Sequence, residues 1–237
     1  MTLVQVDRLD LVLTPRPWPF AAQKRDQIDA FFNEQRAINP ALWNGQVLLL
    51  HGYTIRDTVF QGAYFQTDFA SMLAWRHWDF PDRSVRSCFA MGALQGSDGA
   101  FLLGVMAAHT ANAGKIYFPA GTPEPSDVVG IRVDLARGLM REVEEETGLT
   151  ANHVEAQPGW ATVLAGSRIA QIKVLRAHET AQSLRRRILA HLAGQRQPEL
   201  ADIVVVREEA DFDPMMPPYV TEFLLHVWQQ PHGDRAR

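Results

Sequence analysis

The spacing of apolar residues predicts a chain in which helices and short strands are mixed from end to end. Helices are expected where apolar positions recur three and four residues apart, at 21–38, 67–78, a segment ending at Gly148, 180–193 and 220–228. Strands are expected at 47–50, 58–65, 85–94, 101–106, 161–164, 169–175 and 203–206. The strands at 85–94 and 101–106 flank a turn sequence, which predicts a hairpin. Because the two kinds of element do not alternate strictly, we expect an α+β fold with a sheet covered by helices.

The composition indicates a chain with enough apolar material for a core. Of 237 residues, 46% are hydrophobic and 21% are charged, and 23 Lys+Arg against 27 Asp+Glu give a formal net charge of -4. These values exclude a disordered or fibrous chain, and the length fits one large domain or a domain with an elaborated terminus. The isoelectric point near 6.1 lacks the overall positive field of a general nucleic-acid binder, so no nucleic-acid partner is expected.

The cysteine content and the terminal sequence indicate a cellular location. Cys88 is the only cysteine, so it has no partner for an internal disulfide, and a reducing compartment is expected. The first seven residues do not resemble a signal peptide, and no apolar stretch approaches the length of a membrane span. We therefore expect a soluble cytoplasmic protein with no membrane partner.

Aromatic residues are enriched in the first eighty positions. Two interpretations remain open: a homodimer surface, or a larger core. Trp43, Trp75 and Trp78 are expected in the core rather than as platforms for a base, although the position of Trp75 leaves contact with a nucleotide open.

An acidic segment near residue 145 opposes the local electrostatics of its own helix. In 141–149, four glutamates precede Gly148, which suits the left-handed conformation at a helix C-terminus. The helix dipole disfavours acids at that end by roughly 0.3 to 1 kcal/mol each. Glu142 also faces Glu145 and Glu146, three and four residues away, as like charges. A positive group is expected to offset this cost.

The helical register brings three of the four acids together. At about 100° per residue, Glu142, Glu145 and Glu146 fall within an arc of about 100°, whereas Glu144 falls on the opposite side. The adjoining apolar stripe is expected to consist of Leu135, Ala136, Leu139 and Val143. Carboxylates at the edge of a buried face favour a hard divalent cation such as Mg²⁺, which also takes phosphate oxygens as ligands.

A simpler interpretation has to be weighed against this one. Acid-rich helix faces are usually solvated surface, and the glutamate run alone would favour that reading. The helical register, the terminal glycine and the preceding Arg141 together favour a magnesium cluster that acts on phosphate. Gly138, one turn before Glu142, is further hypothesised to leave room for metal or ligand.

The acidic segment resembles the second half of the Nudix box. That pattern is Arg-Glu, an aliphatic residue, any residue, Glu-Glu, any residue, Gly, and an aliphatic residue. Every specified position is matched, by Arg141, Glu142, Val143, Glu145, Glu146, Gly148 and Leu149.

The first half of the box departs from the family. Family spacing places a glycine where Asp127 stands and a glutamate where Val133 stands. The approach to the box resembles 118–121, followed by an insertion around Glu124, so Glu124 or Asp134 is a candidate substitute for the missing acid.

The resemblance implies a fold and a chemistry. Nudix proteins have an α/β/α sandwich with a mixed sheet, which predicts an N-terminal α/β elaboration at 1–83 and a Nudix domain at 84–237. They hydrolyse nucleoside diphosphates linked to another moiety with Mg²⁺ or Mn²⁺. Carried over, Glu142, Glu145 and Glu146 are metal ligands, and Glu142, Glu145 and Arg141 are catalytic, with Arg141 orienting a glutamate.

The substrate is expected to be a small nucleotide. Short upstream matches resemble a branch that hydrolyses UDP-sugars, and ADP-ribose, coenzyme A and dinucleotides are the alternatives. Gly121, Glu124 and Arg168 are the candidate substrate-binding residues. A further metal ligand is expected from a later loop, with Glu199, Glu208 and Glu209 as unranked candidates. Val133 motivates a second hypothesis, a nucleotide-sensing module that retains the fold and lacks catalysis.

Overall fold

The computed structural model describes residues 1–229 and contains two sheets and six α-helices in that range. The helices are α1 (Pro19–Gln23), α2 (Arg25–Ile38), α3 (Phe69–His77), α4 (Leu135–Thr147), α5 (Ala181–Gly194) and α6 (Pro218–Gln229), with 3₁₀ turns η1 (Pro125–Asp127) and η2 (Glu209–Asp211). The strands are β1 (Thr2–Val6), β2 (Arg8–Leu13), β3 (Gln46–Arg56), β4 (Val59–Asp68), β5 (Ser87–Gln95), β6 (Phe101–Met106), β7 (Ile116–Tyr117), β8 (Ala120–Gly121), β9 (Val128–Val129), β10 (Arg132–Val133), β11 (Val154–Ala156), β12 (Trp160–Ala165), β13 (Arg168–Ala177) and β14 (Leu200–Val206).

The larger sheet is mixed. Its main strand order is β1-β12-β13-β5-β6-β14, with the short strands β11, β7 and β8 paired to β13, β6 and β5. β13 and β5 are parallel, in a register that sets Lys173 opposite Gly92, and the other pairs are antiparallel. β5 and β6 form the predicted hairpin.

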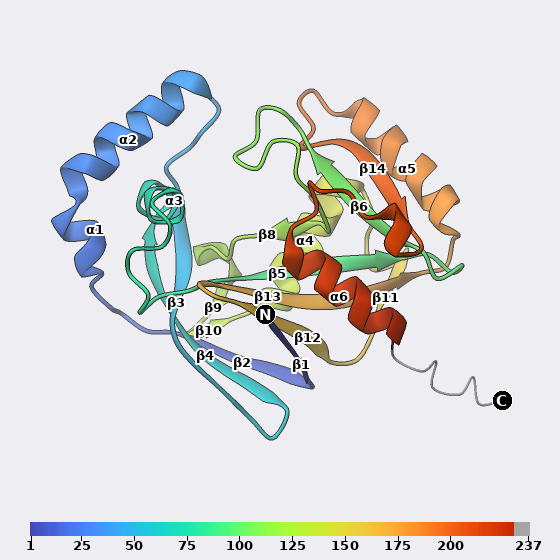
Figure 1. The fold of residues 1–237 in the computed structure, drawn as a ribbon, viewed down its shortest axis with the longest axis horizontal. Coiled ribbons are helices and arrows are strands. Elements are labelled where there is room, and N and C mark those ends of the chain that lie inside the picture. Colours follow the sequence, from blue (N-terminus) through green and yellow to red (C-terminus); the bar gives the residue numbers. More distant parts are fainter. Residues whose placement is uncertain (230–237) are drawn as a thin grey trace.

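Helices cover both faces of this sheet (Figure 1). Gly92 of β5 faces α4, because a Cβ at Gly92 would lie 2.9 Å from Val143 Cγ2. Three residues earlier in the same strand, Phe89 faces the other way and its ring lies 5.7 Å from that of Tyr219 in α6. α5 packs beside α4 and over β14. The expected sandwich of helices around a mixed sheet is therefore confirmed.

The smaller sheet has the order β3-β4-β2-β10-β9 and lies on the left in Figure 1, with α1, α2 and α3 beside it. It is mixed as well, since β2 and β4 run parallel. One bridge joins the two sheets: the backbone N–H of Leu50 donates to the carbonyl of Arg86 at 2.9 Å, and the reverse bond is 2.7 Å.

The N-terminal and C-terminal parts exchange strands across the predicted boundary at 83/84. β1 pairs along its length with β12, so that Thr2 lies opposite Leu164 and Val6 opposite Trp160. Conversely, β9 and β10 belong to the smaller sheet. The division into 1–83 and 84–237 stays a prediction, and its last eight positions lie outside the described residues.

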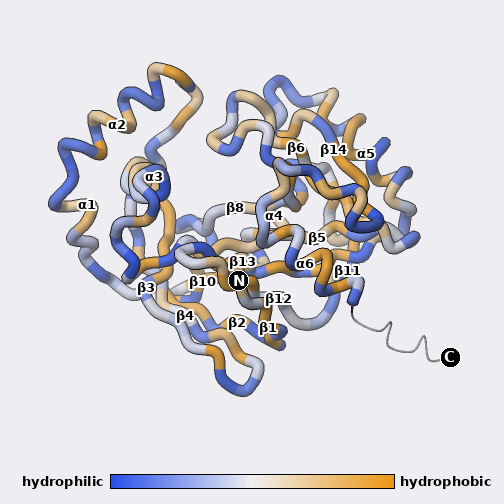
Figure 2. Tube along the Cα trace, viewed as in Figure 1, coloured by the Kyte–Doolittle hydropathy of each residue, from blue (hydrophilic) through white to orange (hydrophobic). Residues whose placement is uncertain are grey.

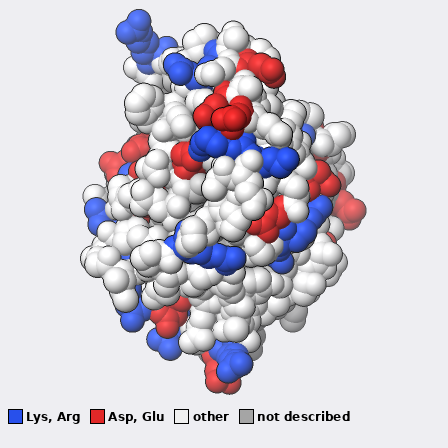
Figure 3. All heavy atoms as spheres, turned by 90° about the vertical axis from the view of Figure 1, so that its left-hand side faces the viewer, with Lys and Arg blue, Asp and Glu red and all other residues white. Residues whose placement is uncertain are grey.

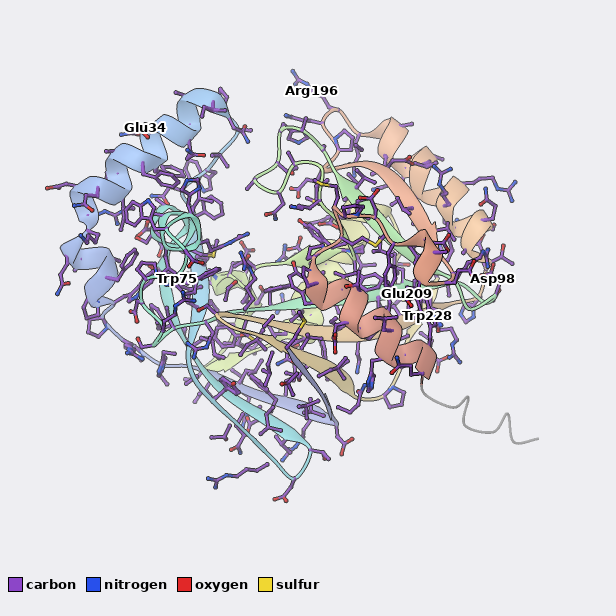
Figure 4. The ribbon with its side chains drawn as sticks, in the orientation of Figure 1. Glu34, Trp75, Asp98, Arg196, Glu209 and Trp228 are labelled. Carbon is purple, nitrogen blue, oxygen red and sulfur yellow. The ribbon has the colours of Figure 1, made fainter. Side chains whose placement is uncertain are left out.

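Two small aromatic clusters extend the core into the N-terminal part. One is built around Trp18, Phe65 and Trp75, where Trp18 and Trp75 have ring centroids 5.9 Å apart. The other contains Ile28 and Phe32 from α2 against α3. Figure 4 shows Trp75 pointing inward from α3, in contrast to Glu34 on the exposed side of α2. Much of the N-terminal aromatic enrichment therefore fills a larger core.

Trp43 is a correction to the sequence-based expectation, because it is 82% exposed. It lies in the irregular segment after α2, where its ring covers Gly45 and no helix or strand packs over its outer side. Neighbouring Ile38 is 80% exposed.

Hydropathy and charge follow this architecture. Figure 2 shows the strands of the larger sheet mainly in apolar colours and α2 with mixed ones. On the face formed by the N-terminal helices, acidic and basic groups are interspersed rather than segregated (Figure 3). Among residues 1–229, no helix combines the length and the apolar character needed to cross a bilayer.

Candidate active site

α4 carries the acidic segment and is fixed at both ends. Asp134 caps its N-terminus by accepting a hydrogen bond from the backbone N–H of Arg137 at 3.0 Å. Gly148 ends it in the left-handed conformation, with φ of 71°. Leu135, Leu139 and Val143 are buried against the sheet as expected, but Ala136 is exposed because it lies about 100° around the helix from Leu135.

The predicted convergence of three acids occurs along the edge of this stripe. Glu144 points away and is exposed. A cleft of about 200 Å³ is lined by six polar residues: Glu142, Glu145, Glu146, Gln195, Gln197 and Glu199.

Burial of two of these acids makes their charged forms unfavourable. Glu146 is 5% exposed, and its Oε2 atom has no hydrogen-bond partner within the described part of the chain. Burial, together with Glu142 and Glu199, raises the pKa of Glu146 well above its usual value. Burial also raises the pKa of Glu142 to about 7, with Arg141 opposing the shift and Glu145 adding to it.

Arg141 is the nearest compensating charge, and it is shared. Its Nη1 atom lies 2.8 Å from Glu142 Oε1 and 3.6 Å from Glu145 Oε2. Its Nη2 atom lies 3.3 Å from Asp127 Oδ1 and 3.5 Å from Glu124 Oε1. One guanidinium therefore serves four carboxylates and leaves the cluster with excess negative charge.

Asp127 is a site residue that the sequence analysis did not assign. It is 3% exposed, and its Oδ2 atom accepts a hydrogen bond from the Glu124 N–H at 3.0 Å. Its carboxylate lies where a side chain at Gly138 would project, since a Cβ there would be 2.8 Å from Asp127 Oδ1. The space beside Gly138 thus holds Asp127, not metal or ligand, which corrects the earlier hypothesis. The family pattern has a glycine where Asp127 stands. Comparison with the pattern therefore showed only that the glycine is missing and assigned no role to the Asp127 carboxylate.

The two candidate substitutes for the missing box acid differ in position. Glu124 Oε1 lies 3.5 Å from Arg141 Nη2. Asp134 instead caps α4 by accepting a hydrogen bond from the Arg137 N–H. Val133 itself is buried in β10 at 5% exposure.

Gly121 lies between Glu142 and a second, larger cavity. A Cβ at Gly121 would lie 2.5 Å from Glu142 Oε1, so the glycine permits close approach of β8 to the carboxylate. Gly121 also lines a cavity of about 420 Å³ on the α6 side of the sheet, and Arg168 lines the same cavity. Glu124 lines neither space.

The structure separates the three late acids. Glu199 precedes β14 and lines the acidic cleft, whereas Glu208 and Glu209 follow β14 at its other end. There Arg207 Nη2 pairs with Asp98 Oδ2 at 2.8 Å, and Figure 4 shows Glu209 and Asp98 on the same side of the molecule. No sequence signal distinguished Glu199, because its position depends on where β14 begins.

The C-terminal end of α5 supports the acidic helix from outside. Gln195 Nε2 donates to the backbone carbonyl of Glu145 at 2.9 Å, and His191 Nε2 lies 3.3 Å from the same oxygen. These contacts satisfy a carbonyl in the last turn of α4, where the helix has no internal donor to offer.

The donor chemistry of the cleft fits a hard divalent cation. Four carboxylates face a small space, one of them buried with an oxygen that lacks a partner in the described chain. The side chains are not arranged as a closed cage: among residues 1–229 no three His, Cys, Asp or Glu side chains have a geometry ready to hold a metal. Glu142, one of the candidate ligands, is paired with Arg141 at 2.8 Å.

No protein-family model matches this chain, and no curated protein sequence matches it. Solved structures with similar architecture include Nudix hydrolases. A Nudix hydrolase from M. smegmatis is 15% identical, with 62% of this chain and 88% of that chain covered and a TM-score of 0.39. A MutT protein from Methanosarcina mazei Go1 is 20% identical over 60% of this chain and 91% of its own, with a TM-score of 0.41. A C. elegans Ap4A hydrolase is 16% identical over 59% and 98%, with a TM-score of 0.38.

Proposed function

We propose that this chain is a Nudix-type hydrolase that cleaves a nucleoside diphosphate linked to another moiety, giving a nucleoside monophosphate and a phosphorylated moiety. The observation that carries the proposal is the convergence of Glu142, Glu145 and Glu146 on one cleft, in the spacing of the second half of the Nudix box. Glu146 is buried there with an unpartnered oxygen within the described residues, a costly arrangement unless a cation is bound.

In this proposal the glutamates hold Mg²⁺ or Mn²⁺, with Glu199 as a further ligand. The bound ion would neutralise the diphosphate and lower the pKa of an attacking water. Glu142 and Glu145 are the candidates to accept the proton of that water, because both lie at the cleft and are more accessible than Glu146. Arg141 orients Glu142, and Asp127 holds Arg141 from the other side.

UDP-sugars are the leading substrate class, followed by ADP-ribose, coenzyme A and dinucleotides. The adjoining cavity of about 420 Å³ has room for a moiety beyond the diphosphate, and Gly121 lies where that cavity meets Glu142. Gly121 and Arg168 are proposed to contact this substrate.

The test is a panel of these nucleotides, with and without Mg²⁺ or Mn²⁺, followed by chromatography of the nucleoside monophosphate. We expect metal-dependent release for at least one class, and a loss of about a hundredfold or more in kcat for Glu145→Gln and for Glu146→Gln. Glu144→Gln is the matched control, because it removes an acid from the opposite side of the same helix. Unchanged turnover in both cleft variants would refute the assignment.

A nucleotide-sensing module is the second candidate, favoured by Val133 at the position where the family has an acid. This candidate predicts nucleotide binding by calorimetry with no product after long incubation. Metal-dependent turnover that Glu146→Gln abolishes would exclude it.

A further inference from the structure

The cavity beside Gly121 is assembled from both parts of the chain. Arg76 comes from α3, on the left in Figure 1, whereas Arg168 begins β13 in the larger sheet. The remaining wall includes Phe89 of β5, Tyr117 of β7 and Tyr219 of α6. α3 thus contributes a side chain to a cavity whose floor belongs to the larger sheet.

The charge of this cavity has a single sign. Three basic residues line it, Arg76, Lys115 and Arg168, and none of the lining residues in the described chain is an acid. The cavity is therefore positively charged, whereas the cleft lined by Glu142 and Glu146 is negatively charged.

The two arginines are not used in structural ion pairs. Arg76 Nη2 donates to Asn112 Oδ1 at 3.2 Å, and Asn112 Nδ2 donates to the Tyr117 hydroxyl at 2.9 Å. The Arg168 guanidinium lies 4.5 Å from the centre of the Phe80 ring. Within residues 1–229 neither arginine lies within 4.0 Å of a carboxylate, although other arginines of the chain do.

The guanidinium groups of Arg76 and Arg168 interact electrostatically with each other and with Tyr219. Burial lowers the pKa of Arg76, and the charge of Arg168 lowers it further. Burial raises the pKa of Tyr219, and both arginines oppose that shift. Two like charges that repel each other, and whose partners within residues 1–229 are an amide and an aromatic ring, are an unfavourable arrangement that an anion between them would relieve.

The cavity also borders the proposed reaction site at one residue. Gly121 lines it, and a Cβ on Gly121 would clash with Glu142, so this glycine lies between the cavity and the Glu142 carboxylate. Tyr117 also lines the cavity, and its hydroxyl accepts a hydrogen bond from Asn112, the residue whose side-chain oxygen accepts from Arg76. A ligand that places its diphosphate at the glutamates would pass Gly121 to reach the arginines.

We propose that the cavity binds an anionic group that the substrate carries in addition to its diphosphate, a carboxylate or a phosphomonoester held between Arg76 and Arg168. The inference rests on the proposed function and narrows its substrate class. A diphosphate substrate with a neutral second moiety would leave both guanidinium groups unpaired in the complex, and it is selected against for that reason.

The test measures binding for two matched pairs of ligands by calorimetry, in a Glu145→Gln background that prevents turnover. UDP-glucuronate and UDP-glucose differ by one carboxylate, and coenzyme A and 3′-dephospho-coenzyme A differ by one phosphomonoester. We expect the anionic member of at least one pair to bind about tenfold more tightly or better. The pair that shows this preference identifies the anion.

Four variants assign the preference to the cavity. Arg76→Met and Arg168→Met should each reduce it severalfold and together abolish it, while Arg76→Lys should keep part of it. Arg186→Met is the control, an exposed arginine on α5 outside both spaces. Thermal unfolding checks that every variant is folded, and the graded Arg76→Lys result remains informative if a methionine variant is unstable.

The possible outcomes separate this inference from the proposed function. Equal affinity for both members of both pairs, or no binding of any of them, overturns the inference, whatever the hydrolase assay gives. Losses that are equal for the anionic and neutral members overturn it too, because the arginines would then hold the shared diphosphate. A further outcome is that the arginine variants remove the preference for the anionic ligand while the natural chain shows no metal-dependent hydrolysis. That combination supports the inference and refutes only the proposed hydrolase activity.

Discussion

Asp127 Oδ1 lies 3.3 Å from Arg141 Nη2, so a buried carboxylate in the loop before α4 holds the guanidinium that contacts Glu142. Asp127 also fills the space above Gly138. Local sequence rules do not predict either contact, and together they explain why a glycine lies inside the helix that carries the acids.

Gly138→Ala is expected to destabilise the protein even though alanine is the better helix former by about 1 kcal/mol. The added methyl group would lie 2.8 Å from Asp127 Oδ1, and overpacking of this kind costs roughly 1 to 3 kcal/mol. Urea denaturation should therefore show a net loss of up to about 2 kcal/mol.

The same substitution in an Asp127→Ala background provides the control. Without the carboxylate, Gly138→Ala should become neutral or stabilising by up to about 1 kcal/mol, so the two changes are not additive. If Gly138→Ala stabilised the natural chain, the packing of Asp127 on this glycine would be wrong.

Gly121→Ala should reduce kcat/KM of the proposed hydrolysis by about tenfold or more while changing the free energy of unfolding by less than about 2 kcal/mol. Its Cβ would lie 2.5 Å from Glu142 Oε1 and 2.6 Å from Cγ and Cδ of the same side chain, so the whole Glu142 side chain would have to move. Movement of Glu142 would break its 2.8 Å contact with Arg141 and displace a proposed ligand. Gly166→Ala, which has open space around its Cβ but a φ of 63°, controls for the effect on stability alone.

The stability of the metal-free protein is expected to fall as pH rises from about 4.5 toward 7 and above. Burial raises the pKa of Glu142 to about 7 and that of Glu146 well above its usual value, so the folded state holds more protons than the unfolded state in this window. Unfolding then releases protons, and higher pH favours it.

Urea titrations at several pH values, with and without Mg²⁺, measure this effect. Added Mg²⁺ should reduce the decline, because an ion bound to the carboxylates stabilises their charged form. The double variant Glu142→Gln, Glu146→Gln should show a flatter profile and little response to Mg²⁺. A profile as steep as that of the natural chain in this variant would contradict the assignment of the effect to these two residues.

Asp68→Ala is expected to cost about 1 to 2 kcal/mol at neutral pH. Asp68 caps α3, accepting from the Ser71 N–H at 2.9 Å and from Arg25 Nη1 at 3.0 Å. Burial alone would raise its pKa, but the hydrogen bonds from Arg25 and Ser71 lower it overall. Its contribution is therefore complete above the unfolded pKa of about 3.9 and is lost as pH falls through the lower folded value.

Asp29→Ala is the matched control for the Asp68 variant. Asp29 also pairs with Arg25, at 2.9 Å, but its side chain is 57% exposed, so its loss should cost less than about 0.5 kcal/mol. Equal losses of stability for the two variants would show that the cap contributes little.

The sequence by itself determined the local features of the site. The register of α4 placed Glu142, Glu145 and Glu146 on one side and Glu144 on the other, because an α-helix has a fixed rotation per residue. The glycine at its end was equally predictable, since Gly148 adopts a positive φ. Most helices were also placed correctly from apolar spacing, although the single helix expected at 21–38 is divided at Lys24 into α1, which begins at Pro19, and α2.

Only the tertiary structure decided which distant residues join this helix. β1 and β2 were not predicted, because their few residues become strands by pairing with β12 and β4, far away in sequence. Asp127, Glu199 and Arg76 reach their sites through a loop, the start of a strand and a helix of the N-terminal part, and such contacts leave no periodic signal. Periodicity reports the face a residue occupies within its own element, whereas the packing of elements determines what that face meets.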